Sequence, residues 1–115
     1  MLNNFVLVGR LVSEPEIIEF ESKKRGKITL ATPRSFKNAN GEYDTDFIEI
    51  TMWGSIAEST IEYCNKGDLV GVKGRIQSVM IEDKNVIEMV AERITFLSQA
   101  KGKEEKWLWK FQSEV

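Results

Sequence analysis

In the run from Asp46 to Trp53, an aliphatic residue stands at every second position from Ile48 to Met52. Successive side chains of a β-strand point to opposite faces, so this period of two predicts a strand. One face, which we expect to lie in a core, carries Ile48, Ile50 and Met52. The other face should meet water, yet it carries Phe47, Glu49, Thr51 and Trp53. Two large aromatic rings on a water-facing surface indicate that the rings have a partner.

Flat rings on a polar sheet face suit unpaired nucleobases. Every base has a π-face, and stacking contributes about 1–3 kcal/mol per base whatever the sequence. The alternative is that Phe47 and Trp53 pack against a neighbouring subunit or against the C-terminal segment. The surrounding sequence favours the first interpretation.

The length of the chain predicts a single domain. Its 115 residues can close one core without disulfides or metals. No apolar run approaches the ~20 residues of a membrane helix. The start Met1-Leu2-Asn3-Asn4 lacks the charged beginning of a signal peptide. We therefore expect a cytoplasmic protein that does not associate with membranes.

The chain has one cysteine, Cys64, and no histidine. This composition excludes Cys/His zinc sites, histidine acid–base chemistry and Ser-His or Cys-His nucleophiles. Carboxylate catalysis stays formally open, but the acidic residues are scattered and form no paired motif. We therefore expect no enzymatic activity, no catalytic residues, no metal and no cofactor.

The net charge of -2 and the pI near 5.3 argue mildly against nucleic-acid binding, which normally rests on a basic surface. The distribution of charge argues for it. A basic cluster at 23–27 is expected at a turn, and further basic residues lie within or beside predicted strands. The alternative interpretation of each basic run is an ordinary solvated surface that binds no ligand. The candidates for phosphate contacts are Arg10, Lys27, Arg34, Lys37, Lys66, Lys73 and Arg75.

The N-terminal half predicts three strands. Residues 4–12 include the run Phe5-Val6-Leu7-Val8, which is apolar on both faces and indicates contact with another subunit. Residues 17–20 lead into the basic turn, and 28–32 form the second strand. Pro33 should interrupt the ladder, with 34–37 continuing as an arm. Asn40-Gly41 predicts a hairpin that joins the arm to the third strand.

The C-terminal half predicts one helix and two strands. Ser55-Ile56-Ala57-Glu58 has the spacing of a capping box, and Gly67 suits a left-handed helix end. This helix should cover one end of a barrel. Residues 69–81 and 86–97 alternate as the fourth and fifth strands, joined by a short polar turn.

The order of three strands, one helix and two strands is the plan of an all-β, five-stranded OB-fold Greek-key barrel with its helix between strands 3 and 4. We assign residues 1–98 to this domain and 99–115 to a short aromatic C-terminal extension.

The sequence also resembles the bacterial and phage single-stranded DNA-binding proteins over roughly residues 1–97. The order and spacing of several fragments carry the resemblance: Asn4-Phe5-Val6-Leu7-Val8-Gly9-Arg10-Leu11, Glu14-Pro15-Glu16, Arg34-Ser35-Phe36-Lys37-Asn38, Asn40-Gly41-Glu42, Asp46-Phe47-Ile48, Trp53-Gly54, Lys66-Gly67-Asp68 and Gly74-Arg75-Ile76-Gln77.

The resemblance implies a homo-oligomer, commonly a tetramer with a dimer as the fallback, that coats single strands during DNA replication, recombination and repair. It also implies contacts with replication or recombination proteins. Its stacking residues map onto Phe36, Phe47 and Trp53. The location is a bacterial cell, or the host cytoplasm for a phage-encoded version.

The sequence departs from the family at several places. Val79-Met80-Ile81 stands where relatives carry basic residues and an aromatic, Glu49 lies on the proposed binding face, and the turn at 82–85 is short. Relatives end in a flexible tail with an acidic tip. Here the ending instead carries Trp107, Trp109 and Phe111, which we expect to dock on the barrel or on a neighbouring subunit. An exposed partner-binding peptide is the alternative.

Two rival functions remain. A primosome-accessory or structural OB module that acts mainly through protein contacts would explain the acidic net charge and the missing basic residues of strand 4. A carboxylate-dependent enzyme has only scattered acidic residues in its favour.

Overall fold

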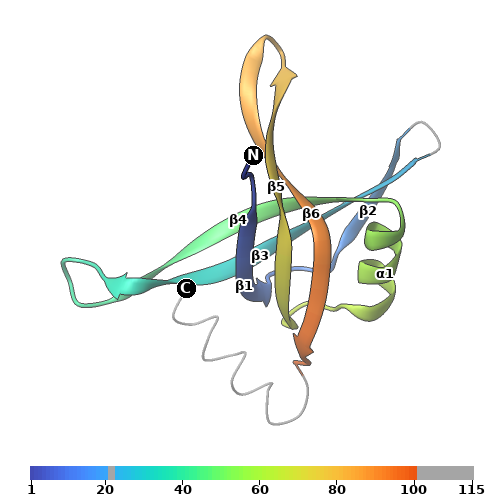
Figure 1. Cartoon of the computed structure of the whole chain (residues 1–115). Helices are drawn as coiled ribbons and strands as arrows, with labels where there is room; N and C mark the ends of the chain where they lie inside the picture. The colour runs from blue at the N-terminus through green and yellow to red at the C-terminus, as the bar shows by residue number, and fades with distance from the viewer. Residues whose placement is uncertain (21–22, 101–115) are drawn as a thin grey trace.

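The structure, a computed structural model, describes residues 1–20 and 23–100 and is almost entirely β (Figure 1). The predicted docking of the aromatic ending lies outside the described residues. Along the chain the elements are β1 (Phe5–Leu11), β2 (Glu16–Phe20), β3 (Lys23–Lys37), β4 (Tyr43–Trp53), α1 (Ser55–Tyr63), β5 (Leu69–Ile81) and β6 (Lys84–Ser98).

The strands close into a barrel, as the OB plan predicts. The sheet order is β1-β5-β6-β4-β3-β2, and β1 also pairs with β3, which closes a ring of β1, β5, β6, β4 and β3. Neighbours along the ring are antiparallel except β4 and β6, which pair in parallel at Thr51 and Val90. The fourth and fifth strands lie where the sequence placed them, and α1 lies between β4 and β5.

The segment at 16–27 differs from the prediction. Residues expected to lead into a basic turn form β2, which pairs antiparallel with the first part of β3. The basic cluster at 23–27 is therefore strand and not turn. The register sets Glu16 opposite Lys27 and Ile17 opposite Gly26, and a cross-strand pair of opposite charges favours this pairing.

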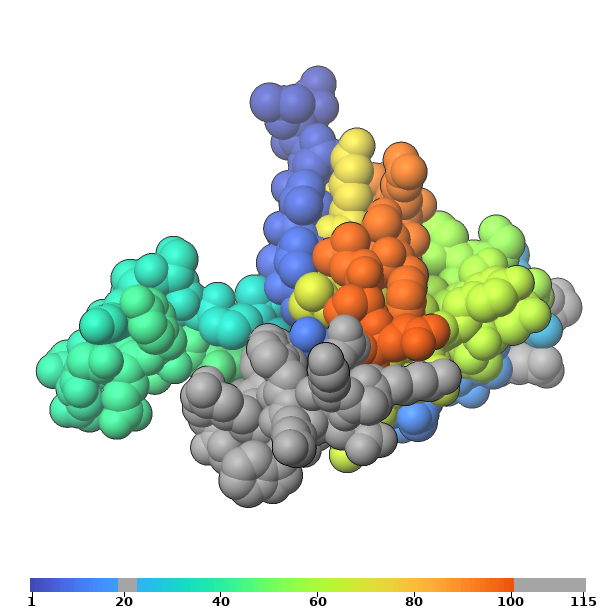
Figure 2. All heavy atoms as spheres, turned by 90° about the horizontal axis from the view of Figure 1, so that it is seen from below, coloured from blue at the N-terminus to red at the C-terminus, as the bar shows by residue number. Residues whose placement is uncertain are grey.

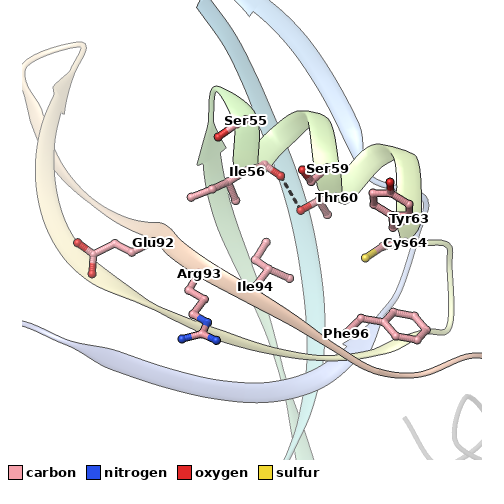
Figure 3. Close-up of a pocket in the computed structure, with 10 residues that line it drawn as sticks. All are labelled: Ser55, Ile56, Ser59, Thr60, Tyr63, Cys64, Glu92, Arg93, Ile94 and Phe96. Atoms are coloured by element: carbon pink, nitrogen blue, oxygen red, sulfur yellow. Dashed lines mark hydrogen bonds between the residues drawn. The ribbon is translucent and has the colours of Figure 1, made fainter.

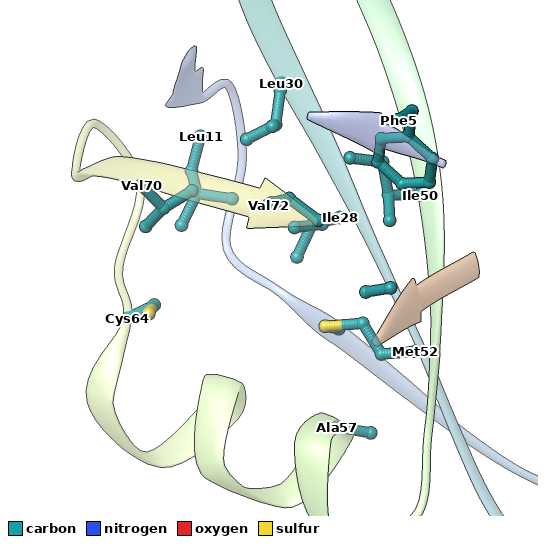
Figure 4. Close-up of a cluster of buried hydrophobic side chains, with 11 residues drawn as sticks. Phe5, Leu11, Ile28, Leu30, Ile50, Met52, Ala57, Cys64, Val70 and Val72 are labelled. Atoms are coloured by element: carbon teal, nitrogen blue, oxygen red, sulfur yellow. The ribbon is translucent and has the colours of Figure 1, made fainter. Parts of the chain in front are cut away.

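The core fills the barrel and extends under α1 (Figure 4). Leu30, Ile50 and Met52 are fully buried, as the alternation predicts. Ala57 of α1 and the nearby Cys64 close one end. The predicted capping box is wrong: Gly54 occupies the N-cap with φ 59°, and no side chain caps the helix. The chain enters the helix directly from the β3–β4 ladder, because the Gly54 N–H still donates to the Lys24 carbonyl at 2.8 Å, and the positive φ at the N-cap suits glycine.

Two long hairpins extend beyond the barrel (Figure 1). The β3–β4 arm projects as a limb of its own (Figure 2). Its register shifts between Pro33 and Lys37, which confirms the predicted interruption. At its tip the Gly41 N–H donates to the Asn38 carbonyl, and Gly41 has φ 78°, which confirms the Asn40-Gly41 turn. The other long hairpin joins β5 and β6.

Candidate nucleic-acid interface

One face of the β3–β4 ribbon carries three of the predicted site residues, namely Lys27, Phe47 and Trp53. Residues opposite each other in an antiparallel ladder share a face, and the register sets Trp53 opposite Arg25 and Thr51 opposite Lys27. Phe47 shares that face by alternation and is 53% exposed. Phe36, on the arm, is 63% exposed. The two rings are therefore accessible to a ligand.

Thr51 lies on the same face but is buried, although the alternation predicted a water-facing position. Its backbone pairs with Val90 of β6, so β6 approaches the ribbon there. The β5–β6 hairpin and the ribbon thus form the two walls of a cleft of about 270 Å³. Lys27, Glu49 and Glu88 line this cleft together with apolar side chains such as Ile81 and Ile87.

Trp53 is half-buried and already has a cation beside it. The Arg25 guanidinium lies over the indole ring, 5.7 Å from its centroid, in a geometry that favours cation–π attraction. Trp53 also borders a shallow depression lined by Lys23 and Lys24. Sequence reasoning missed Arg25 as a site residue, because the cluster at 23–27 was placed in a turn. Extension of the second predicted strand back to Lys23, with the register of β3 on β4, would have set Arg25 opposite Trp53.

A chain of polar contacts ties β5 to the ribbon. Arg75 donates to the Gln77 side chain at 3.4 Å, and Gln77 donates to Glu88 at 2.8 Å. Arg25 donates to the other oxygen of Glu88 at 3.4 Å. The predicted Arg75 is thereby linked to Trp53 through side chains. Glu88, which is largely buried, orients Arg25.

The arm carries a second group of charges. Arg34 forms a fork with Asp46, donating from Nε at 3.1 Å and from Nη2 at 2.9 Å. The hydrogen bond from Arg34 lowers the pKa of Asp46, and the same contact raises the pKa of Arg34. The Lys37 ammonium lies 5.8 Å from the centroid of Tyr43. Tyr43 is 54% exposed and was also missed.

The remaining predicted basic residues divide into two groups. Lys27 lies on the ribbon, 2.9 Å from Glu49, and Lys73 is exposed on β5. Arg10 is only 6% exposed and donates to the Gly67 carbonyl at 2.9 Å. Lys66 lies in the turn between α1 and β5, where its N–H donates to Glu14. The structure therefore does not bring Arg10 and Lys66 to the ribbon face.

A separate groove of about 410 Å³ lies between α1 and β6 (Figure 3). Ile56 and Ile94 point into it from opposite sides, and Thr60 donates to the Ile56 carbonyl. Burial raises the pKa of the Cys64 thiol, with a further contribution from Asp68, so Cys64 behaves as a small buried hydrophobe.

Within residues 1–20 and 23–100, no metal-binding cluster of acidic or thiol side chains occurs. No helix in those ranges is long and apolar enough to cross a membrane.

Comparison with known proteins gives a consistent result. The sequence model of the single-strand binding protein family matches residues 2–97. The chain is 41% identical over 103 residues to the single-stranded DNA-binding protein B of Bacillus subtilis, covering 84% of this chain and 91% of that protein. It is 39% identical over 107 residues to the single-stranded DNA-binding protein 1 of Clostridium acetobutylicum, covering 87% and 97% respectively.

The fold comparison agrees. The crystal structure of the single-stranded DNA-binding protein from Thermus aquaticus superposes with a TM-score of 0.74 at 24% identity. The match covers 84% of this chain and 50% of the Thermus chain, and it shows a shared fold.

Proposed function

The chain belongs to the single-strand binding protein family and binds single-stranded DNA, and from this premise we propose that it does so without regard to base sequence, through the β3–β4 ribbon and the neighbouring strand β5. In this proposal Phe36, Phe47 and Trp53 stack on bases. Lys27, Arg34, Lys37, Lys73 and Arg75 contact phosphates, with Arg25 added from the structure. The DNA-binding domain is residues 1–98, with 99–115 as an extension.

One observation carries the proposal: two phenylalanine rings are more than half exposed on a surface otherwise rich in charge. Stacking tolerates any base, because it uses the π-face and not the edge. The cations around the rings supply the phosphate contacts that do not depend on sequence. Such a protein would protect single strands during replication, recombination and repair.

The direct test is a gel shift with labelled oligo(dT), followed by tryptophan fluorescence. Trp107 and Trp109 would be replaced by phenylalanine, which leaves Trp53 as the sole reporter. We expect a shift at micromolar protein and a change in Trp53 emission, because stacking places a base against the indole. A chain that shifts no oligonucleotide would instead favour the OB module that acts through protein contacts.

We also propose that the protein is a homo-oligomer, a tetramer or at least a dimer, assembled through β1. This strand pairs with β5 from Phe5 to Arg10 but with β3 only at Arg10 and Leu11. Val6 is 72% exposed and Val8 is 48% exposed. A strand with one edge largely unpaired and an apolar outer face is suited to association with another copy.

Val6→Lys should therefore lower the molar mass measured by light scattering at micromolar concentration. The charge would be buried without a counterion in the interface. Tyr63→Lys on α1 is the control, because Tyr63 is 68% exposed and lies on another element. A wild-type monomer, or equal effects of both substitutions, would contradict assembly through β1.

A further inference from the structure

Two cations of the β3–β4 ribbon are held by acidic side chains of the same ribbon. Lys27 lies on the face that carries Phe47, whereas Arg34 lies beside Asp46, which alternation places on the opposite face. The Arg34 guanidinium donates two hydrogen bonds to Asp46, and the Asp44 carboxylate lies 3.7 Å from Arg34 Nη1. Lys27 Nζ lies 2.9 Å from Glu49 Oε2. Arg34 and Lys27 are also among the residues proposed to contact phosphate. Any phosphate that binds them must therefore meet a carboxylate already in place.

A carboxylate and a phosphate use the same donors of a guanidinium. Both accept two parallel N–H bonds from the arginine fork. The Nε and Nη2 donors of Arg34 are engaged by Asp46. The lowered pKa of Asp46 keeps this carboxylate ionised at neutral pH. Glu49 likewise forms an ion pair with the Lys27 ammonium, which partly neutralises its charge.

We propose that Asp46 and Glu49 compete with the DNA phosphates for Arg34 and Lys27. The two carboxylates thereby limit the affinity of the β3–β4 ribbon and set how tightly a single strand is held. This inference rests on the proposed function. Without DNA the two carboxylates occupy Arg34 and Lys27. When DNA binds, each phosphate gains a cation only by displacing a carboxylate, which then lies beside the phosphate as a like charge.

The competition is reversible because the ion pairs are exposed. The side chains of Arg34 and Asp46 are 42% and 43% exposed, and those of Lys27 and Glu49 are 43% and 66% exposed. Exposed pairs are screened by water and salt and are readily opened. They therefore weaken phosphate contacts without preventing them. Glu88 differs, because its side chain is only 14% exposed and is fixed by Gln77. We assign Glu88 to the positioning of Arg25.

The opposite role for Asp46 and Glu49 is also physically reasonable. A carboxylate that holds Arg34 extended could preorganise it for phosphate, as supporting residues do in many binding sites. The two roles differ in the sign of one measurement. Removal of the negative charge strengthens DNA binding if the carboxylate competes, and weakens it if the carboxylate positions the cation.

The experiment measures oligo(dT) affinity of the full chain at several salt concentrations for Asp46→Asn and Glu49→Gln. We expect each to raise the affinity roughly threefold to tenfold at low salt, the scale of one partly screened charge. The slope of log K against log salt should steepen by up to about 0.7, the share of one additional phosphate contact on a single strand. In the Arg34→Ala background, Asp46→Asn should lose most of its gain in affinity, because the cation for which Asp46 competes is absent.

Glu42→Gln is the matched control. It removes one negative charge from the tip of the same arm, and Glu42 forms no ion pair with the residues that the structure describes. An equal gain in affinity for Glu42→Gln would show that the effect comes from net charge alone, and it would overturn the proposal. A lower affinity of Asp46→Asn and Glu49→Gln, or an affinity equal to that of the wild type, would also overturn the proposal. Either result would leave the proposed function standing. Failure of the wild type and all variants to bind would instead refute the proposed function.

Discussion

Replacement of Phe36 and Phe47 together by alanine should weaken oligo(dT) binding by about 2–6 kcal/mol, because in the proposed mode each ring stacks on one base and each stack contributes about 1–3 kcal/mol. That loss corresponds to roughly 30-fold or more in dissociation constant. The fold should hardly change, since both rings are more than half exposed and outside the buried core. Fluorescence anisotropy with labelled oligo(dT) measures the loss, and thermal unfolding measures the stability.

Tyr63→Ala is the control for this pair. Tyr63 is as exposed as Phe36, at 68% against 63%, but it lies on α1 and not on the ribbon. Its removal should leave the affinity unchanged. Equal binding by the double variant and the wild type would refute stacking at these two positions. A large fall in melting temperature would show that the rings stabilise the fold.

The second large effect concerns Gly74 in β5. A Cβ at this position would overlap the Val90 carbonyl oxygen of β6 and would lie 2.8 Å from Cε2 of Phe5. Backbone cannot move aside as a flexible side chain can, so Gly74→Ala must shift β6 or β1. Overpacking of this kind costs about 1–3 kcal/mol, and more where backbone is displaced.

Gly71 gives a matched control in the same strand. A Cβ at Gly71 would approach no heavy atom more closely than 3.8 Å. Gly71→Ala should therefore change stability by less than about 1 kcal/mol, with a stabilising contribution from the restricted unfolded chain. For Gly74→Ala we expect the melting temperature to fall by about 4–8 °C for each kcal/mol lost. Equal melting temperatures for the two variants would contradict the close approach of β5 and β6.

Much of the barrel follows from patterns within short stretches. The alternation from Asp46 to Trp53 identifies β4 and its core face, and the turn at Asn40-Gly41 joins it to the arm. The fourth strand was predicted with the bounds that β5 has. These features depend on side-chain periodicity and on backbone preferences of single residues, which a sequence displays directly.

The features that were missed depend on pairing between distant segments. Nothing local to Glu16–Phe20 shows that it pairs with the basic cluster, so β2 was read as a connection. Thr51 looked water-facing because its burial comes from β6. Arg25 was not selected because its position over Trp53 depends on the pairing of β3 with β4. The contacts of Arg34 with Asp46 and of Lys27 with Glu49 likewise require the register of β3 on β4.

The parallel contact between β4 and β6 has a consequence for how the chain folds. The pairs β2–β3, β3–β4 and β5–β6 join strands that are neighbours in sequence. The Thr51–Val90 contact instead joins the two halves of the chain across α1. Bringing two distant segments together costs loop-closure entropy before their contact contributes any favourable free energy. We therefore expect the hairpins to form early and independently. The β4–β6 contact and the still more distant β1–β5 pairing should close later, so that the two walls of the cleft come together only at the end.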